Sequence, residues 1–331
     1  MFKVKISGIG KTVGSRVVTS TELEKVMDVK PGWIEKATGI KSRNYVDFEN
    51  GETALTLGVS AAKKAVEDAG ITLDKIDCII GANGSPLQAI PCAAALYQQE
   101  LGLGDSGVPS FDIDTTCYSF GVALFLASGL VDSGVYKNIL IISADAPSPT
   151  LDITDNEVRA LFGDGAGAVV LTKTSEDEPS RVHHFKMNTY GSGASFTEVR
   201  GGGTLKHPNH PETTPLDNVF HMEGKKIFKY AVRYLPSYFE SFFVDSGINQ
   251  KELKFILPHQ TSKHGIDIFR KFGFASEQIA SHLSIHGNCI AASIPMLLHD
   301  YIKNGEIKRG DQILLFGTSA GLSLGGLALT Y

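Results

Sequence analysis

The chain has 331 residues, of which 42% are hydrophobic and 20% are charged, and its formal net charge is −5 at pH 7. This composition is typical of an ordinary soluble globular protein rather than a disordered one, and the length is enough for one large or two ordinary domains. The negative charge argues against a general nucleic-acid binder, which needs an excess of Lys and Arg on one surface.

The first half of the chain alternates apolar strands with helices, which favours an α/β layered fold. Nearly unbroken apolar runs, such as 76–81, are typical of strands that are covered on both faces. The expected strands are 4–9, 76–81, 110–114, 138–143 and 166–172, and the expected helices are 52–69, 91–101 and 117–133.

The second half repeats this alternation. The expected strands are 184–189, 255–258, 312–316 and 322–331, and the expected helices are 222–247, 262–272 and 288–302. The segment 137–144 resembles 310–317, and each precedes a Gly-rich turn, so we predict two similar halves. The linker-like segment 175–180 separates a first half at 1–174, which carries a nucleophilic cysteine, from a second half at 181–331.

No stretch of the sequence has the ~20 apolar residues of a membrane span, and the N-terminus lacks a signal-peptide pattern, so we expect a cytoplasmic protein. A Gly- and Pro-rich stretch at 201–216 is expected to form a long surface loop near a site. His207 and His210 in this loop have no thiol or carboxylate cluster beside them, and we predict no metal site there.

The four cysteines lack the spacing of a metal site or a disulfide scaffold and are expected to be free thiols. We predict that Cys78, on a strand, and Cys92, early in a helix, have packing roles, because free cysteine behaves as a small buried hydrophobe. Cys289 is also assigned to packing.

Cys117 follows a short strand and opens a helix of small and apolar residues. The positive end of a helix favours a thiolate, which is the nucleophilic form of cysteine. His259 ends an apolar strand before Ser262, which is suited to cap the next helix, and Asn288 opens a further small-residue helix. Each of the three residues alone is also compatible with a structural role.

The order Cys, His, Asn suits thiol acyl chemistry if the three side chains converge on one pocket. A papain-like protease uses the same residue types, but its sequence signature is absent around Cys117. The protease interpretation is therefore rejected.

Five motifs together resemble the β-ketoacyl-[acyl carrier protein] synthase III family from end to end. They are 114–117 (DTTC), 161–168 (LFGDGAGA), 258–260 (PHQ), 286–288 (HGN) and 317–323 (GTSAGLS). The resemblance implies a thiolase-like, five-layered αβαβα fold built from two duplicated halves, usually a homodimer, and a role in fatty-acid or specialised-metabolite synthesis.

The resemblance also implies a mechanism. Cys117 accepts an acyl group from a thioester, and His259 with Asn288 supports decarboxylation of a malonyl thioester, whose carbanion attacks the acyl-enzyme. Backbone N–H groups of Cys117 and of Ala320 or Gly321 would stabilise the first oxyanion. Thioesters of coenzyme A or acyl-carrier protein are the implied substrates and partners, and neither a metal nor another cofactor is implied.

The chain departs from the family at the expected coenzyme A contacts. Trp33 matches a tryptophan that stacks on adenine, but the family's two arginines are replaced by Ala37 and Asn156. Ser262 and His264 stand where the family usually has Asn and Arg. We therefore hypothesise a specialised member that takes acyl groups from a carrier protein, or that transfers them in secondary-metabolite or signal synthesis rather than starting bulk fatty-acid synthesis.

Two further residues are assigned to the substrate pocket by the resemblance. Phe162 would shape the backbone beside it, and Ile90, at a position where the family often projects a phenylalanine into the partner subunit, would admit a longer or branched acyl group. Two other functions are weighed: acyl transfer to an oxygen or nitrogen acceptor without decarboxylation, and a catalytically silent heterodimer partner. The intact Cys117, His259 and Asn288 argue against the silent partner.

Overall fold

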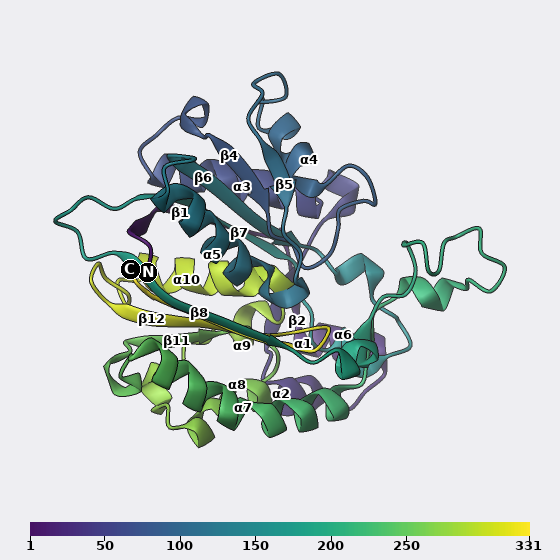
Figure 1. Cartoon of the computed structure of the whole chain (residues 1–331). Helices are drawn as coiled ribbons and strands as arrows, with labels where there is room; N and C mark the ends of the chain where they lie inside the picture. The colour runs from purple at the N-terminus through teal and green to yellow at the C-terminus, as the bar shows by residue number, and fades with distance from the viewer.

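Two β-sheets lie one above the other, with helices between them and on both outer faces (Figure 1). The computed structural model describes residues 1–331. The first sheet has the strand order β1-β7-β6-β4-β5, with β1 and β7 antiparallel to their neighbours and β6, β4 and β5 parallel. Its strands are β1 (Val4–Val13), β4 (Cys78–Gly81), β5 (Ser110–Asp112), β6 (Asn138–Asp145) and β7 (Gly165–Lys173).

The second sheet comes entirely from the second half of the chain and has the order β11-β12-β13-β8. Here β11 and β12 are parallel, and the other pairs are antiparallel. Its strands are β8 (Arg181–Thr189), β11 (Phe255–Pro258), β12 (Gln312–Ser319) and β13 (Ser323–Thr330). Both sheets thus join parallel strands to antiparallel ones, as duplication predicts.

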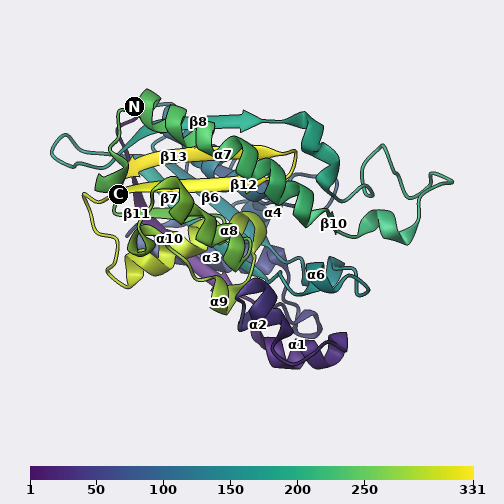
Figure 2. The same ribbon diagram turned by 90° about the horizontal axis from the view of Figure 1, so that it is seen from below.

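Six helices complete the layers. They are α3 (Ala54–Asp68) and α4 (Ala93–Glu100) on the outer face of the first sheet, α5 (Ser119–Asp132) and α10 (Ser293–Lys303) between the sheets, and α7 (Gly224–Ser246) and α8 (Lys263–Asp267) outside the second. Seen from below, α7 crosses the second sheet on its outer face (Figure 2). The predicted αβαβα layering is confirmed.

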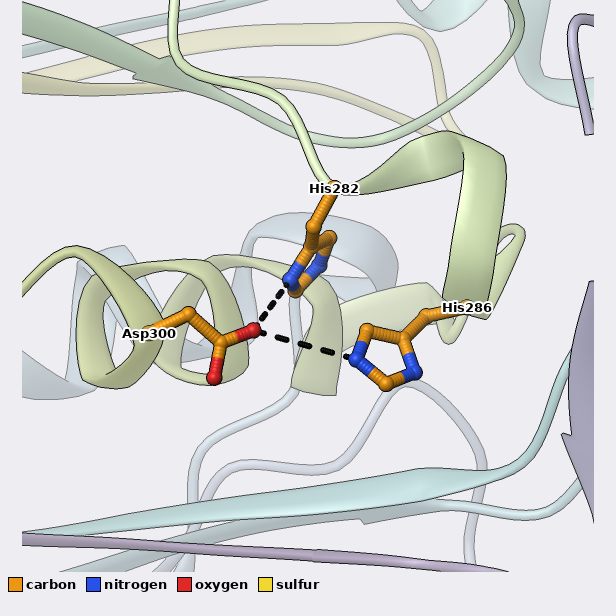
Figure 3. Close-up of side chains that lie close together, drawn as sticks. All are labelled: His282, His286 and Asp300. Atoms are coloured by element: carbon orange, nitrogen blue, oxygen red, sulfur yellow. Dashed lines mark hydrogen bonds and ion pairs between the residues drawn. The ribbon is translucent and has the colours of Figure 1, made fainter. Parts of the chain in front are cut away.

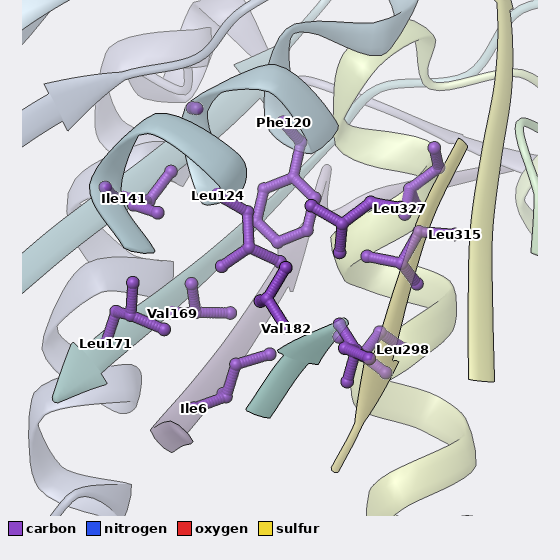
Figure 4. Close-up of a cluster of buried hydrophobic side chains, with 14 of the residues drawn as sticks. Ile6, Phe120, Leu124, Ile141, Val169, Leu171, Val182, Leu298, Leu315 and Leu327 are labelled. Carbon is purple, nitrogen blue, oxygen red and sulfur yellow. The ribbon is translucent and has the colours of Figure 1, made fainter. Parts of the chain in front are cut away.

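The largest core lies between the sheets, where Phe120 and Leu124 of α5 and Leu298 of α10 pack together (Figure 4). Along β6, Ile139 and Ile141 face this core while their neighbours face the core beneath α3. This alternation explains the unbroken apolar run, because a strand covered on both faces buries every side chain. No helix of the chain is both long and apolar enough to cross a bilayer.

The sequence interpretation passed over a peripheral unit between β1 and α3. It comprises β2 (Arg16–Thr19), α1 (Ser20–Met27), α2 (Trp33–Thr38) and β3 (Ser42–Tyr45). A capping box between Thr19 and Glu22 marks the start of α1 and was a readable signal. The remaining short elements are α6 (Asn156–Arg159), α9 (Leu283–His286), β9 (Thr197–Glu198) and β10 (His221–Met222).

The segment 201–216 is a long loop, as predicted, and it extends away from the body of the molecule (Figure 1). It contains no regular element before a short 3-10 helix, η6 (Pro215–Asn218). The ring nitrogens Nδ1 of His207 and His210 accept hydrogen bonds from nearby backbone N–H groups.

Three sequence predictions need correction. Cys92 is exposed and precedes α4 as its N-cap residue, so the predicted packing role is wrong, whereas Cys78 and Cys289 are buried. Cys117 does not open a long helix but lies in a 3-10 turn, η3 (Thr116–Tyr118), before α5. Asn288 likewise precedes a 3-10 turn, η10 (Ile290–Ala292), and α10 begins only at Ser293.

Candidate active site

A single cavity of about 1370 Å³ brings Cys117, His259 and Asn288 together, as the sequence predicted. It lies between the two halves, and about half of its lining residues are hydrophobic, including Leu235 and Phe316 from the second half. Its volume exceeds the ~300–1,000 Å³ of ordinary small-molecule pockets. The site therefore has room for a substrate with a sizeable apolar portion.

The turn that carries Cys117 is held by two side chains. The Oδ1 atom of Asp114 accepts a hydrogen bond from the Thr116 N–H at 2.7 Å, and the Oγ atom of Ser119 accepts one from the Thr115 N–H at 2.9 Å. Thr116 has φ of 49°, a left-handed conformation that β-branched residues rarely adopt. This backbone interrupts the helix and fixes the position of Cys117.

Tyr118, the residue after the candidate nucleophile, is fully buried. Its hydroxyl donates to the Leu315 carbonyl at 3.1 Å. A Cβ atom added at Gly317 or Gly325 would lie 2.2 Å from the Tyr118 ring. These two glycines are required because any side chain there would displace the ring and, with it, the turn that carries Cys117.

The turn that carries Asn288 has the same construction. The Oδ1 atom of Asn288 accepts the Ile290 N–H at 2.9 Å, and the Ser293 Oγ atom accepts the Cys289 N–H at 3.0 Å. Ile290 has φ of 48°. Because the side-chain oxygen is already engaged, the amide NH₂ is the group that Asn288 offers to a ligand in the cavity.

His259 lies directly after β11, and its N–H donates to the Phe316 carbonyl at 2.8 Å. The residue is 5% exposed, and its Nδ1 atom has no hydrogen-bond partner. Burial lowers the pKa of His259 to about 4, so the imidazole is neutral at pH 7. A neutral imidazole provides one N–H donor and one acceptor.

The expectation that Cys117 favours the thiolate is not met in the unliganded site. Burial raises the pKa of Cys117 to about 12, and the nearby charge of Asp145 adds to this, while backbone N–H groups of Ala320 and of Cys117 itself lower it. The effect of desolvation on the pKa of Cys117 is larger than that of the helix N-terminus, because α5 begins two residues after Cys117. The N–H of Ala320 nevertheless faces the sulfur and favours its ionised form.

The predicted substrate-binding residues divide into two groups. Phe162 and Ser262 line the cavity, where Phe162 packs edge-to-face on Phe220 and the Ser262 hydroxyl caps α8. Trp33 and Ile90 lie outside the lining of the cavity: Trp33 packs against the small core of α1 and α2, and Ile90 is 85% exposed. Their assigned roles stay predictions.

A second polar cluster lies outside the cavity and comprises Lys11, His282, His286, His299 and Asp300. The Asp300 carboxylate faces both His282, at 2.9 Å from Nδ1, and His286, at 3.8 Å from Nε2 (Figure 3). The set resembles a metal site, but the Lys11 ammonium is paired with Asp300 and lies 3.3 Å from His286 Nε2. The side-chain ammonium group of Lys11 therefore already occupies the position that a metal ion would take.

Comparison with known proteins decides the family. Two family profiles match, 3-oxoacyl-[acyl-carrier-protein] synthase III over residues 111–191 and its C-terminal counterpart over 243–331. A β-ketoacyl-[acyl-carrier-protein] synthase III of Rhizobium rhizogenes is 33% identical over 335 residues, covering 100% of both chains.

The chain belongs to the β-ketoacyl-[acyl-carrier-protein] synthase III family. It is thus an acyltransferase of the condensing type. The solved synthase III structures from Aquifex aeolicus and Thermus thermophilus are similar, with TM-scores of 0.88 and 0.86 and identities of 34% and 30%. The first comparison covers 99% of this chain and 100% of the other, and the second covers 98% of each.

The sequence interpretation missed one polar residue of this region. Asp145 ends the buried strand β6, is fully buried, and accepts hydrogen bonds from two separate loops. A carboxylate at the end of an apolar strand, directly before Ala146 and Pro147, was the available signal.

Proposed function

We propose that the chain catalyses decarboxylative Claisen condensation of an acyl group held on Cys117 with a malonyl thioester. The observation that carries this proposal is that one cavity collects the Cys117 thiol, the neutral His259 imidazole and the Asn288 amide. Each group enters from a separate segment of the chain, and the turns that hold Cys117 and Asn288 are tightly hydrogen-bonded.

The first step is transfer of the acyl group to the enzyme. The Cys117 sulfur attacks the thioester carbonyl, the bond to the donor thiol breaks, and that thiol leaves with the proton of Cys117. The N–H groups of Cys117 and Ala320 stabilise the tetrahedral oxyanion, as preorganised backbone donors do in acyl-transfer enzymes. Because the site is buried, these donors act in a low dielectric, where they stabilise the oxyanion more than they would in water.

The second step forms the carbon–carbon bond. The carboxylate of the malonyl thioester leaves as carbon dioxide, and the electron pair passes to an enolate whose oxygen receives hydrogen bonds from His259 and Asn288. The α-carbon then attacks the acyl carbonyl, the bond from that carbonyl to the Cys117 sulfur breaks, and the β-ketoacyl thioester is released. The Cys117 thiolate takes a proton from solvent. A neutral imidazole suits this role, since it keeps an N–H donor without carrying a charge in a buried site.

The cavity supports an acyl group longer than acetyl. The apolar wall from α7 includes Ala231 and Leu235, and Leu87 and Ala89 contribute from the first half. Each buried methylene contributes about 0.8 kcal/mol, so an apolar chain is a favoured occupant of such a space. We assign the substrate as a medium or long acyl thioester.

A carrier protein is the proposed acyl donor, because Ala37 and Asn156 remove two cationic contacts that coenzyme A phosphates would use. The loop around Leu205 lies at the cavity, and Ser262 replaces another expected polar contact. A homodimer is proposed as well, with the exposed Ile90 directed at the partner subunit.

The test is intact-mass detection of the acyl-enzyme with a panel of acetyl to hexadecanoyl thioesters, offered on coenzyme A and on acyl-carrier protein. Release of labelled carbon dioxide from malonyl-carrier protein then measures condensation. Acylation of Cys117 followed by transfer to an oxygen or nitrogen acceptor, without carbon dioxide release, would contradict the proposal and support the alternative acyltransferase.

A further inference from the structure

A single buried carboxylate connects the two halves of the active site. Asp145 is the last residue of β6 and is fully buried. It accepts the Gly84 N–H at 3.0 and 3.1 Å and the Ser85 N–H at 3.1 Å. From the second half it accepts the Ala291 N–H at 3.1 Å and the Ala292 N–H at 3.4 Å.

The two loops that Asp145 holds both form the active site. Gly84 and Ser85 line the cavity, and Ala291 and Ala292 lie in η10, the 3-10 turn directly after Asn288 and Cys289. Every backbone contact is a donor to Asp145, which suits a carboxylate acceptor. Burial raises the pKa of Asp145 to about 7, and these N–H donors act against that rise. In the ionised form each of these charge-assisted bonds is roughly twice as strong as a neutral one.

The Asn288 turn needs such an anchor. Ile290 is held at φ of 48°, and a non-glycine residue in this region costs about 1–3 kcal/mol and persists only where the surroundings fix it. The two amides bound by Asp145 are those immediately after Ile290. By binding these two amides, Asp145 holds the backbone next to Ile290. The N–H of Ile290 in turn donates to the Oδ1 atom of Asn288 at 2.9 Å and orients that side chain.

The Cys117 turn is anchored from the opposite half in the same manner. Ser319, the last residue of β12, donates from its hydroxyl to the Thr115 carbonyl and lies 3.0 Å from the Thr116 hydroxyl. The strand end of each half therefore holds the catalytic turn of the other half. The Ser319 contact has a side-chain donor, whereas Asp145 supplies an acceptor with two oxygens.

We infer that Asp145 is a positioning residue for the carbon–carbon bond-forming step, because its carboxylate fixes the turn that presents the Asn288 amide to the enolate oxygen. This inference rests on the proposed function. Asp145 does not need to touch the substrate, since it acts through the backbone of Ala291 and Ala292. The acylation of Cys117, which does not use Asn288, depends on it less.

The first test is the near-isosteric variant Asp145→Asn. It retains one acceptor oxygen but turns an NH₂ group toward backbone donors, which leaves buried N–H groups unpaired. We expect the rate of carbon dioxide release from malonyl-carrier protein to fall roughly 10- to 100-fold, the equivalent of one or two lost hydrogen bonds. The single-turnover rate of Cys117 acylation should not fall by more than about threefold, because Asp145 does not bind the Cys117 turn and the loss of its charge removes one of the causes that raise the pKa of Cys117.

Asp77→Asn is the matched control. The Asp77 carboxylate also accepts two backbone N–H groups, those of Lys137 and Asn138 at 2.9 Å each, but these donors lie at the start of β6, at the opposite end of the strand from Asp145 and outside the cavity lining. We expect both variants to lower the melting temperature. Only Asp145→Asn should change the ratio of the condensation rate to the acylation rate, so a general loss of stability is distinguished from a loss of positioning.

A double-mutant cycle with Asn288→Ala removes the remaining ambiguity. If Asp145 acts through Asn288, then adding Asp145→Asn to Asn288→Ala should slow condensation by less than about threefold further. Full multiplication of the two separate effects would overturn the inference, as would an equal loss of acylation and condensation in the single variant. A wild-type enzyme that releases no carbon dioxide contradicts the proposed function, whereas normal condensation by Asp145→Asn contradicts the positioning role alone.

Discussion

Thr116 and Ile290 share the same left-handed backbone conformation, with φ of 49° and 48°. Each is the second residue after a side-chain oxygen that accepts its N–H, from Asp114 and Asn288 respectively. The following segments match as well, since Ser119 and Ser293 accept the N–H four residues before them. The two halves thus use one turn twice, once to present the Cys117 thiol and once to present the Asn288 amide.

This correspondence supports the proposed division of the chain at the linker 175–180. Asn288 occupies the position of Asp114, and Ala291 that of Cys117. One copy of the turn places its reactive group after the left-handed residue, and the other places it before that residue. Duplication therefore supplied two similar supports that now hold different chemical groups.

Cys117→Ala should abolish the mass increase that an acyl thioester produces, because the nucleophile is removed while the alanine fits the space. Cys92→Ala is the matched control, since Cys92 is an exposed thiol outside the cavity lining. Intact-mass spectrometry checks both variants. If Cys117→Ala is still acylated, and the acylation disappears only when Cys92→Ala is added, then Cys92 rather than Cys117 is the nucleophile.

Gly325→Ala should destabilise the protein by about 1–3 kcal/mol, the usual cost of overpacking a core. The new methyl group would lie 2.2 Å from the Tyr118 ring, which must then move together with the Cys117 turn. We expect a lower melting temperature and slower Cys117 acylation. Gly104→Ala is the control, because its nearest neighbouring atom lies at 4.0 Å, and it should leave both quantities unchanged.

Ala231→Phe should shift substrate preference toward short acyl chains. Ala231 lines the cavity from α7, and a phenyl ring there would occupy space assigned to the acyl chain. For long thioesters, kcat/KM should fall about 10- to 200-fold for each methylene group that the ring displaces from the pocket. For acetyl thioesters, kcat/KM should change little. Val232→Phe, on the exposed side of the same helix, should not alter the preference.

An unchanged ranking of thioesters in Ala231→Phe would show that the acyl chain lies elsewhere. A wild-type preference for acetyl over every longer chain would contradict the assigned substrate directly. Both outcomes are read from single-turnover acylation rates, which do not depend on the condensation step.

The buried histidines should lower the stability as the pH drops below about 6.5, and Asp145 and Asp164, whose pKa values burial raises to about 7 and about 6, should oppose this fall. Burial lowers the pKa of His259 to about 4 and that of His286 to about 3, and it also lowers the pKa of His282. The unfolded chain therefore binds protons between pH 6.5 and these values while the folded chain does not. Each histidine then removes about 1.4 kcal/mol of unfolding free energy per pH unit.

Urea denaturation between pH 8 and pH 4 measures this effect. The contribution is fully present above the unfolded-state pKa, so the free energy of unfolding should be flat with respect to these groups from pH 7 to 8. His286→Asn should reduce the slope below pH 6. An unaltered slope would indicate that His286 is protonated in the folded state, where the Asp300 carboxylate is paired with Lys11.

The sequence by itself determined the layers and the chemical groups. Apolar strands such as β4 and β6 are readable because burial on both faces leaves no polar position, and Cys117, His259 and Asn288 are readable because each follows a strand or precedes a helix. The family resemblance, carried by motifs around the same residues, led to the five-layered fold and the condensing enzyme, which the comparisons confirm.

Tertiary structure alone decided the geometry that links these residues. The left-handed conformations of Thr116 and Ile290 contradict local preference, and contacts from the ends of distant strands, made by Ser319 and Asp145, add to the local side-chain bonds that hold them. Cys92 is exposed, whereas burial raises the pKa of Cys117 and keeps it as the protonated thiol in the unliganded site. Neither outcome is readable from sequence, because burial depends on which segments cover a residue rather than on its neighbours in the chain. Asp145 binds Gly84 and Ala291, which lie 61 and 146 positions away from it in the sequence. Local sequence patterns carry no information over such separations.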